Sequence, residues 1–226
     1  MGAAGDARHD LLKELRETLF TAIISDSLDA IGCTAQAVSP AIRPLDEGLV
    51  MVGFARTMLY ADVYERPAPG ENPYELEIAL VDSLQPGDVA VCACGASGRI
   101  APWGGLLSTA SRVRGAAGTL TDGLVRDIRD IRELGFPVHH GGIGPLDSSG
   151  RGKVIAIDVT VECGGVTVRP GDIVFGDADG CVVIPKDRID EVLGVARHKL
   201  RGEFGTRKAL LDGRPLADVY AEFGIL

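Results

Sequence analysis

The segment APWGGLLSTASRVRGAAGTLTDGLVRDIRDIRELGFPV, residues 101–138, contains the pattern that decides the fold. Its apolar spacing predicts a helix at 105–114, a strand at 116–120, a helix near 127–134 and a short strand at 136–139. Helices that alternate with short apolar strands in this way are typical of an α/β layered protein.

The sequence on either side extends this alternation. Apolar spacing predicts one helix over residues 7–32 and another over 187–200, which leads into a C-terminal helical tail. Two Pro-Gly-Asp turns, in QPGDVAVCACG and RPGDIVFGD, each start a short apolar strand. The remaining elements expected are strands within 41–64, a loop at 65–73, a helix at 74–83, a loop at 141–153 and strands within 154–184. We therefore expect an α/β layered sandwich with mixed sheets and terminal helices, in a single domain over residues 1–226.

Composition and charge exclude several classes of protein. The 226 residues include 23 lysines and arginines against 32 aspartates and glutamates, so the formal net charge is −9. Such a molecule repels phosphate backbones and anionic membrane surfaces, and no basic patch offsets this. The apolar runs are strand-sized, far below the roughly 18 residues that span a bilayer, and residues 1–10 lack an apolar signal region. We expect a cytoplasmic protein that binds neither nucleic acid nor membrane.

The five cysteines form an odd set without the C-x-x-C spacing of zinc or redox sites. Cys92 and Cys94 alternate within VAVCACG, which directs both side chains to the same face of a strand. This pattern favours small core residues over metal ligands.

Gly104 and Gly105 stand directly before the helix at 105–114, and Gly115 is placed to end it. A helix that starts with two glycines exposes backbone N–H groups at the positive end of its dipole, which suits a carboxylate or a phosphate. The same residues also form a tight turn without binding any ligand, and the spacing by itself favours this second interpretation.

Arg126 and Asp127 are adjacent at a junction between strand and helix. In a structural interpretation, Asp127 caps the helix, with Asp130 three residues on as in a capping box, and Arg126 is a solvated charge. In a functional interpretation, Arg126 is a fixed cation for a developing enolate and Asp127 a hard oxygen ligand for Mg²⁺ or Mn²⁺. The pattern by itself leaves both open.

Four stretches together resemble one known family. They are ISDSLDAIG at 24–32, WGGLLSTASRVRGAAGTLTDGLVRD at 103–127, GPLDSSGRGKV at 144–154 and PGDIVFGDADGCVVIP at 170–185. They are similar to the family of ribonuclease regulator A and the class II 4-hydroxy-4-methyl-2-oxoglutarate aldolases, and the resemblance covers nearly the whole chain. It implies a β/β/α swivelling-type sandwich that forms a homotrimer or homohexamer, with active sites between subunits.

The resemblance also implies roles for individual residues. Arg126 matches the arginine that contacts the keto oxygen and stabilises pyruvate enolate, and Asp127 matches the carboxylate that binds the divalent metal. The helix start at Gly104 and Gly105 matches the substrate-binding segment, in which the N–H groups of Leu106 and Leu107 hold the pyruvyl carboxylate. Glu203 is the best positional match to a glutamate that a neighbouring subunit supplies.

Position 105 departs from the family pattern, because in the aldolases an acidic residue is followed by twenty intervening residues and then Arg-Asp, whereas this chain has Gly105 at that position. The missing carboxylate would order metal-bound water and assist proton transfer. We therefore expect oxaloacetate decarboxylation, which needs no hydroxyl deprotonation, to be favoured over aldol cleavage.

The expected function is a lyase that depends on Mg²⁺ or Mn²⁺ and acts on small 2-oxo acids. It would cleave 4-hydroxy-4-methyl-2-oxoglutarate-type acids, decarboxylate oxaloacetate, or both, through pyruvate enolate. The alternative is a regulator of ribonuclease activity that is not an enzyme and acts by docking. The pair Arg126 and Asp127 favours the lyase, whereas Gly105 keeps the regulator open.

Other polar residues have weaker patterns. His139 and His140 are adjacent, so on a strand they point to opposite faces and cannot both bind one metal. Asp177 and Asp179 are interpreted as turn formers. The last group consists of Ser25 and Asp26, interpreted as a polar pair on a helix face, and Arg151, expected to face another subunit.

Overall fold

The structure, a computed structural model, describes residues 3–95 and 97–224. Its main sheet has the strand order β1-β5-β4-β3-β2-β9-β10, and β6 pairs with the second half of β2. The strands are β1 (Arg43–Pro44), β2 (Met51–Asp62), β3 (Asp88–Ala93), β4 (Gly118–Val125), β5 (Val138–Ile143), β6 (Gly152–Ile157), β9 (Ile173–Asp177) and β10 (Gly180–Ile184). Strands β2 to β5 run parallel, whereas β1, β6, β9 and β10 are antiparallel to their neighbours. The expected mixed sheet is confirmed.

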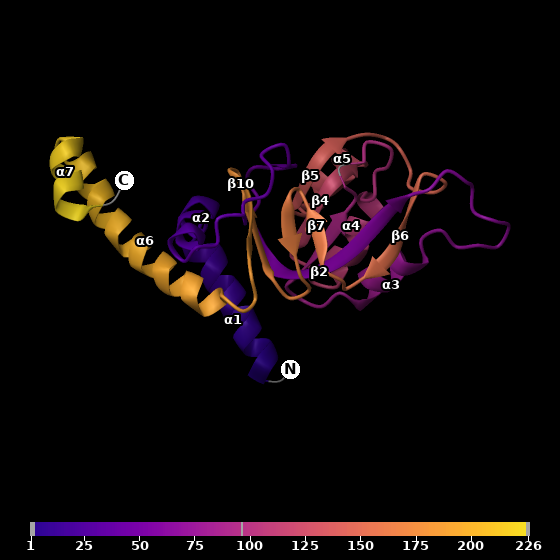
Figure 1. Cartoon of the computed structure of the whole chain (residues 1–226), viewed down its shortest axis with the longest axis horizontal. Helices are drawn as coiled ribbons and strands as arrows, with labels where there is room; N and C mark the ends of the chain where they lie inside the picture. Colours follow the sequence, from indigo (N-terminus) through magenta and orange to yellow (C-terminus); the bar gives the residue numbers. More distant parts are fainter. Residues whose placement is uncertain (1–2, 96, 225–226) are drawn as a thin grey trace.

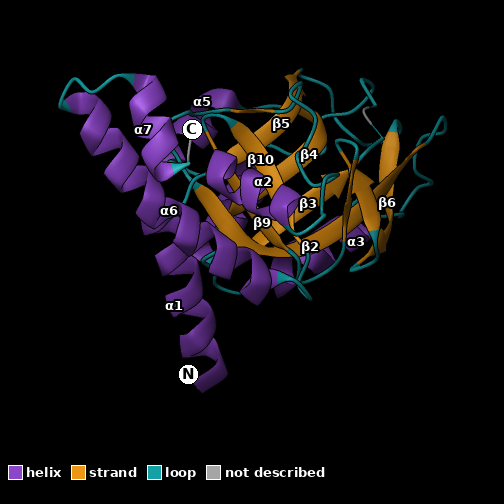
Figure 2. Cartoon of the chain, turned by 60° about the vertical axis from the view of Figure 1, so that its left-hand side comes forward, coloured by secondary structure: helices purple, strands orange, loops and turns teal. Residues whose placement is uncertain are grey.

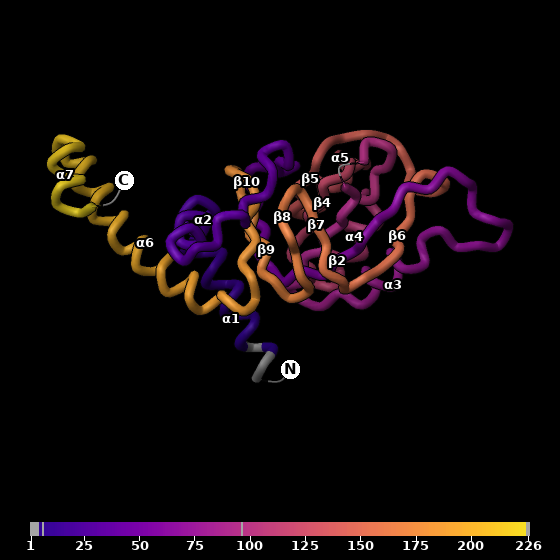
Figure 3. Tube along the Cα trace, viewed as in Figure 1, coloured from indigo at the N-terminus to yellow at the C-terminus, as the bar shows by residue number. Residues whose placement is uncertain are grey.

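Each face of the sheet has its own cover, which produces the expected three layers (Figures 1 and 3). The covering elements are α3 (Glu75–Ser83), α4 (Gly105–Val113) and α5 (Ile128–Leu134) on one face and the hairpin of β7 (Val161–Cys163) and β8 (Val166–Val168) on the other. Strand β3 shows why, because its side chains alternate. Ala90 and Cys92 pack with the helices, whereas Val89 and Val91 pack with the hairpin.

Cys94 also packs against the helix-side cluster that contains Cys92. The five cysteines are all free thiols, and Cys92 is buried. The interpretation of Cys92 and Cys94 as core residues is therefore confirmed.

The N-terminal helix is not continuous, so the prediction of one helix over 7–32 is wrong. The structure has α1 (Ala3–Thr18) and α2 (Thr21–Ala30), and Phe20 between them is extended. The break follows from a distant side chain, since Asp177 accepts hydrogen bonds from the backbone N–H of Thr21 at 2.8 Å and from its Oγ1 at 2.6 Å. Asp177 thus satisfies the start of α2, which confirms its structural interpretation.

The C-terminal helix is longer than predicted. α6 (Ile189–Leu211) continues eleven residues beyond the expected end at 200 and is followed by α7 (Leu216–Phe223). Helices α1, α2 and α6 gather at one end of the sheet beside β9 and β10 (Figure 2), and the far half of α6 extends away from the layers with α7 (Figure 1). No helix within 3–95 or 97–224 is long and apolar enough to cross a membrane.

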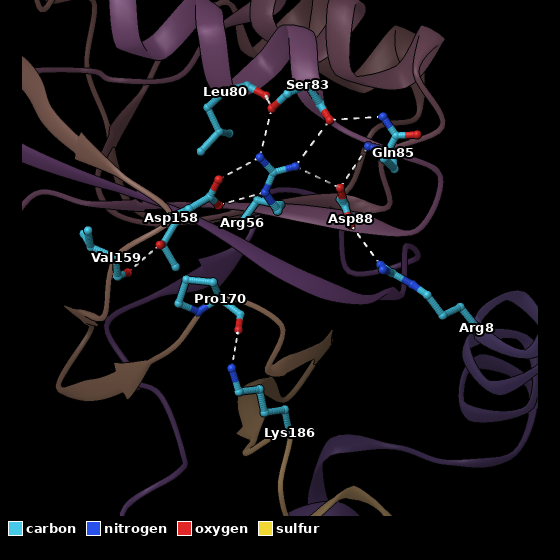
Figure 4. A network of polar contacts seen from close by, with 11 residues as sticks. Arg8, Arg56, Leu80, Ser83, Gln85, Asp88, Asp158, Val159, Pro170 and Lys186 are labelled. Carbon is cyan, nitrogen blue, oxygen red and sulfur yellow. Dashed lines mark hydrogen bonds and ion pairs between the residues drawn. The ribbon is translucent and has the colours of Figure 1, made fainter. Parts of the chain in front are cut away.

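The two Pro-Gly-Asp turns use the same local device. The Asp88 carboxylate accepts from the N–H of Gln85 at 2.8 Å, and the Asp172 carboxylate accepts from the N–H of Arg169 at 2.7 Å. Gly87 has a φ of +83°, a left-handed conformation that glycine adopts without steric cost because it has no Cβ. Asp88 also pairs with arginines of α1 and β2, part of the network in Figure 4 that joins these elements to the end of α3.

Candidate active site

A cavity of about 330 Å³ lies at the carboxyl end of β4, where the segment before α4 and the loop after β5 meet. Open parallel sheets bind ligands at this end of their strands. The residues that line it are Tyr74, Glu77, Ile78, Ala101, Pro102, Trp103, Gly104, Leu106, Leu107, Arg126, Asp127, Asp147 and Ser148. A cavity of about 870 Å³ beside α1 is larger, but Arg126 and Asp127 do not line it. Chemistry rather than volume therefore selects the smaller one.

Asp127 occupies the position just before α5 in a left-handed conformation, with φ 58° and ψ 39°. Its side chain does not cap α5. Instead, Oδ2 accepts a hydrogen bond of 3.0 Å from the backbone N–H of Gly105 at the start of α4. The interpretation of Asp127 as a capping box is therefore wrong, because the carboxylate points to another helix. A non-glycine residue in this conformation costs about 1–3 kcal/mol, and such strain is concentrated at functional sites.

The two glycines allow this approach. A Cβ on Gly104 would lie 2.6 Å from Oδ2 of Asp127, so a side chain at this position would displace the carboxylate from where it lies. The start of α4 thus binds a carboxylate that belongs to the chain itself, whereas the sequence interpretation concerned a carboxylate or phosphate ligand.

Two further N–H groups remain at the same helix start. The first intrahelical bond runs from the N–H of Ser108 to the carbonyl of Gly104, so the N–H groups of Leu106 and Leu107 precede it and have no acceptor among the described residues. The Leu106 side chain is 87% exposed, which leaves this edge of the cavity accessible. The geometry fits the expected grip on a substrate carboxylate.

Arg126 is held beside Asp127 and is not a solvated charge. Its Nε lies 3.9 Å from Asp127 Oδ2, and its Nη2 lies 3.3 Å from Asp147 Oδ1. The hydroxyl of Tyr74 in turn donates to Asp147 Oδ2 at 2.7 Å. These contacts fix the guanidinium at the cavity wall, where it can stabilise negative charge. Asp147 and Tyr74 were not predicted as site residues, although Asp147 falls within the family stretch at 144–154.

Asp130, which the sequence analysis named only as part of a capping box, also lies at the site. A Cβ placed on Gly105 would lie 3.2 Å from the Cβ of Asp127, and 3.4 Å and 3.5 Å from the Cβ and Oδ2 of Asp130. Asp130 thus borders the space that an acidic side chain at position 105 would enter. The available signal was spacing, because residues three apart on a helix share a face.

The donor set fits a hydrated divalent cation. Asp127 and Asp130 offer hard carboxylate oxygens, and Mg²⁺ in proteins is usually bound by one or two carboxylates together with substrate oxygens and water. The described residues contain no group of three or more His, Cys, Asp or Glu side chains that could hold a metal. A cation here would therefore depend on the substrate for part of its coordination.

Glu77 on α3 also lines the cavity, yet the residue is buried. The hydroxyl of Tyr60 donates to Glu77 Oε2 at 3.0 Å. Burial raises the pKa of Glu77 to about 7, against the lowering effect of the Tyr60 hydrogen bond. Sequence analysis did not identify Glu77, because an isolated glutamate in a short helix carries no recognisable pattern.

Other candidates lie elsewhere. Glu203 is on α6, at the opposite end of the molecule from α4 within one chain (Figure 1), so its expected role depends on a neighbouring subunit. His139 and His140 are both buried in β5 and neither lines the cavity. Asp26 pairs with Lys199 at 3.3 Å and ties α2 to α6. Arg151 donates to the backbone oxygen of Asp147 at 3.2 Å and thereby holds the loop that carries this acid.

Comparison with known proteins agrees with this geometry. Residues 21–183 match the RraA-like family, described as Aldolase/RraA. A protein of Halalkalibacterium halodurans named "Putative 4-hydroxy-4-methyl-2-oxoglutarate aldolase" is 33% identical over 216 residues, which is 96% of each chain.

Two solved structures share the fold. The crystal structure of Streptomyces coelicolor RraAS2, described as an unusual member of the RNase ES inhibitor RraA family, is 30% identical with a TM-score of 0.74 and covers 87% of this chain and 95% of its own. A protein from Pseudomonas syringae pv. tomato is 27% identical with a TM-score of 0.81, covering 93% and 96%. With the sandwich layers and the Arg126–Asp127 junction in place, these matches show that the chain belongs to the Aldolase/RraA family.

Proposed function

We propose that the protein is a divalent-metal-dependent lyase that releases pyruvate from small 2-oxo acids, by aldol cleavage, by decarboxylation of oxaloacetate, or by both. The observation that carries the proposal is the placement of Arg126 beside Asp127 at the start of α4, next to the N–H groups of Leu106 and Leu107. The relative from Halalkalibacterium halodurans, named "Putative 4-hydroxy-4-methyl-2-oxoglutarate aldolase" and matched over 96% of each chain, supports it.

Each residue has a distinct part in binding and reaction. The N–H groups of Leu106 and Leu107, at the positive end of α4, hold the substrate carboxylate. Arg126 then faces the 2-oxo group and stabilises the negative charge that develops there when the bond between carbons 3 and 4 breaks. This charge exists only in the transition state and the enolate, so the arginine lowers the barrier rather than merely binding the substrate.

Asp127 and Asp130 would hold the cation, Mg²⁺ or Mn²⁺. When bound, it would supply a Lewis acid that polarises the 2-oxo group. Asp130 also provides a carboxylate beside position 105, where this chain lacks the family acid. Glycine at position 105 still favours oxaloacetate over hydroxy acids if no other residue removes the hydroxyl proton.

The test is pyruvate formation from oxaloacetate and from 4-hydroxy-4-methyl-2-oxoglutarate, before and after dialysis against EDTA. We expect turnover to be lost on chelation and to return with MgCl₂ or MnCl₂. Undiminished turnover in EDTA would remove the metal from the mechanism.

A second function is supported by the likeness to RraAS2, a member of the RNase ES inhibitor RraA family. A regulator of this kind would bind a ribonuclease without needing Arg126 or Asp127. Arg126→Ala separates the two functions, because it should lower pyruvate formation by roughly two or more orders of magnitude and leave inhibition of ribonuclease intact.

A further inference from the structure

Glu77 is a buried carboxylate that faces the cavity of the proposed lyase. Its side chain is 6% exposed and projects from α3 toward the sheet, where Tyr60 of β2 meets it. A buried ionisable group carries a large desolvation cost, so it persists only where a partner or a function compensates. Tyr60 satisfies one carboxylate oxygen, and the other has no hydrogen-bond partner within the described part of the chain.

The groups around Glu77 come from several elements. They are Tyr60 of β2, Cys92 and Cys94 of β3 and its end, Arg126 at the end of β4, Asp147 in the loop after β5, and Tyr74 just before α3. Burial raises the pKa values of Cys92, Cys94 and Tyr60, so all three remain neutral near pH 7. Asp147 raises the pKa of Glu77 and Arg126 lowers it, so their charges partly offset each other.

We propose that Glu77 is the proton-transfer residue of this site, taking the proton of the substrate hydroxyl in aldol cleavage and returning it to carbon 3 of the pyruvate enolate. The proposal rests on the lyase function proposed above. It assigns proton transfer to a residue of the same chain, because Gly105 replaces the acidic residue that would assist this step in the family.

The step balances without a further reactant. The Glu77 carboxylate accepts the hydroxyl proton while the O–H electron pair forms the new carbonyl at carbon 4. The electrons of the bond between carbons 3 and 4 move into the enolate, whose charge Arg126 stabilises. The protonated Glu77 then returns its proton to carbon 3, which gives pyruvate, a second carbonyl compound and the original carboxylate. In decarboxylation, carbon dioxide leaves and the same acid protonates carbon 3, after which solvent replaces the proton.

A group that acts as base and then as acid works best when its pKa lies near the working pH. The pKa of Glu77, raised by burial to about 7, meets this condition. The Tyr60 hydroxyl stabilises the charged form of Glu77, so this hydrogen bond both positions the carboxylate and lowers its pKa.

The test compares Glu77→Gln with Glu75→Gln, an exposed glutamate on the same helix. Gln keeps the shape of the side chain and still accepts from Tyr60. Two activities are measured with MgCl₂ present: cleavage of 4-hydroxy-4-methyl-2-oxoglutarate, and exchange of the pyruvate C3 protons with D₂O by NMR. We expect Glu77→Gln to lower both by about 10²–10⁴-fold, with KM nearly unchanged, and Glu75→Gln to alter neither.

The pH profile separates proton transfer from a structural role. Wild-type cleavage should rise with pH through about 7 as Glu77 ionises. Tyr60→Phe removes the hydrogen bond that lowers this pKa, so the rise should move to higher pH while the plateau kcat is retained.

Three results would overturn the proposal: full exchange activity in Glu77→Gln, an unchanged pH profile in that variant, or an unshifted profile in Tyr60→Phe. If the wild type itself forms no pyruvate and exchanges no protons, the lyase function fails and this proposal fails with it. If the wild type is active and Glu77→Gln is equally active, the lyase stands and only the assignment of Glu77 falls.

Discussion

At the scale of single residues, Asp127 combines an unusual backbone conformation with a side chain that lies at the site. It adopts a left-handed conformation, turns away from its own helix and accepts from the N–H of Gly105. Helix α4 and the absent side chain of Gly104 make this position tolerable, because the helix supplies a donor and the glycine supplies space. The strain at Asp127 is thus balanced by contacts that also aim its carboxylate at the cavity.

Asp127→Ala and Arg126→Ala should therefore fail in different ways. Loss of Asp127 should abolish pyruvate formation by removing a ligand of the cation. Loss of Arg126 should lower turnover by roughly two or more orders of magnitude, as the loss of one preorganised charge does, and leave metal affinity largely intact. Isothermal titration with Mn²⁺ distinguishes the two. Equal Mn²⁺ binding by wild type and Asp127→Ala would disprove the ligand assignment.

Gly105→Asp tests the relation between position 105 and Asp130. The new Cβ would lie 3.2 Å from that of Asp127 and 3.4 Å from that of Asp130, so a third carboxylate would be crowded against two others. We expect the single variant to lower activity. The double variant Gly105→Asp, Asp130→Ala moves the carboxylate from position 130 to position 105 and should recover activity, with aldol cleavage gaining relative to decarboxylation. Comparison of kcat/KM for both substrates decides the matter, and a double variant no better than the single one would contradict it.

The raised pKa of Glu77 also predicts that the free energy of unfolding depends on pH. Its folded pKa of about 7 lies above its ordinary value of 4.5, so the folded state holds a proton that the unfolded state has released between these values. The free energy of unfolding should therefore fall by about 3 kcal/mol as pH rises from 4.5 to 7. Glu77→Gln should not show this part of the decline. Urea unfolding at pH 5 and pH 8 measures it, and parallel losses in both proteins would show that Glu77 is not the cause.

At the scale of elements, β2 organises the sheet. It pairs with β3 along one edge, and with β9 and then β6 along the other. Gly53 is the point of closest approach, because a Cβ there would collide with the carbonyl oxygen of Gly87 in the first Pro-Gly-Asp turn and lie 2.9 Å from Val89. The turn and the strand can pack together only because position 53 has no side chain.

Gly53→Ala should consequently destabilise the protein by about 1–3 kcal/mol or more, since overpacking forces the backbone to shift. Gly194→Ala is the matched control. It lies in α6 with nothing within 4 Å of its added Cβ, and alanine should stabilise the helix by up to about 1 kcal/mol. Urea denaturation should show a lower free energy of unfolding for Gly53→Ala and an equal or higher one for Gly194→Ala. Equal effects of the two substitutions would refute the contact at Gly53.

At the scale of the whole molecule, the arm formed by α6 and α7 leaves the layered body and exposes apolar side chains (Figure 1). Phe204, Leu211, Leu216 and Tyr220 are 77%, 82%, 53% and 51% exposed. Apolar exposure of this kind is typical of surfaces that bind another protein. We propose that a second copy covers the arm in a homotrimer or homohexamer, so that Glu203 reaches a neighbouring site.

Shared sites can be detected by mixing two inactive proteins. Arg126→Ala and Glu203→Gln each remove one contribution, and co-refolded mixtures contain sites in which both are intact. A random mixture should recover about a quarter of wild-type activity, and light scattering should show a trimer or a dimer of trimers. An active monomer, a fully active Glu203→Gln, or a mixture of two inactive variants that recovers no activity would each contradict the shared site.

Local pattern alone determined the layers and the helix start at Gly104 and Gly105, because alternation and glycine punctuation act within a few residues. Only the tertiary structure decided the rest. Asp177 holds the start of α2 from 156 positions away, and Asp127 binds α4 rather than its own helix. Glu77 gains its raised pKa from burial. Desolvation and capping depend on which groups are in contact in the folded protein. These contacts join residues far apart in the sequence, so spacing along the chain does not predict them.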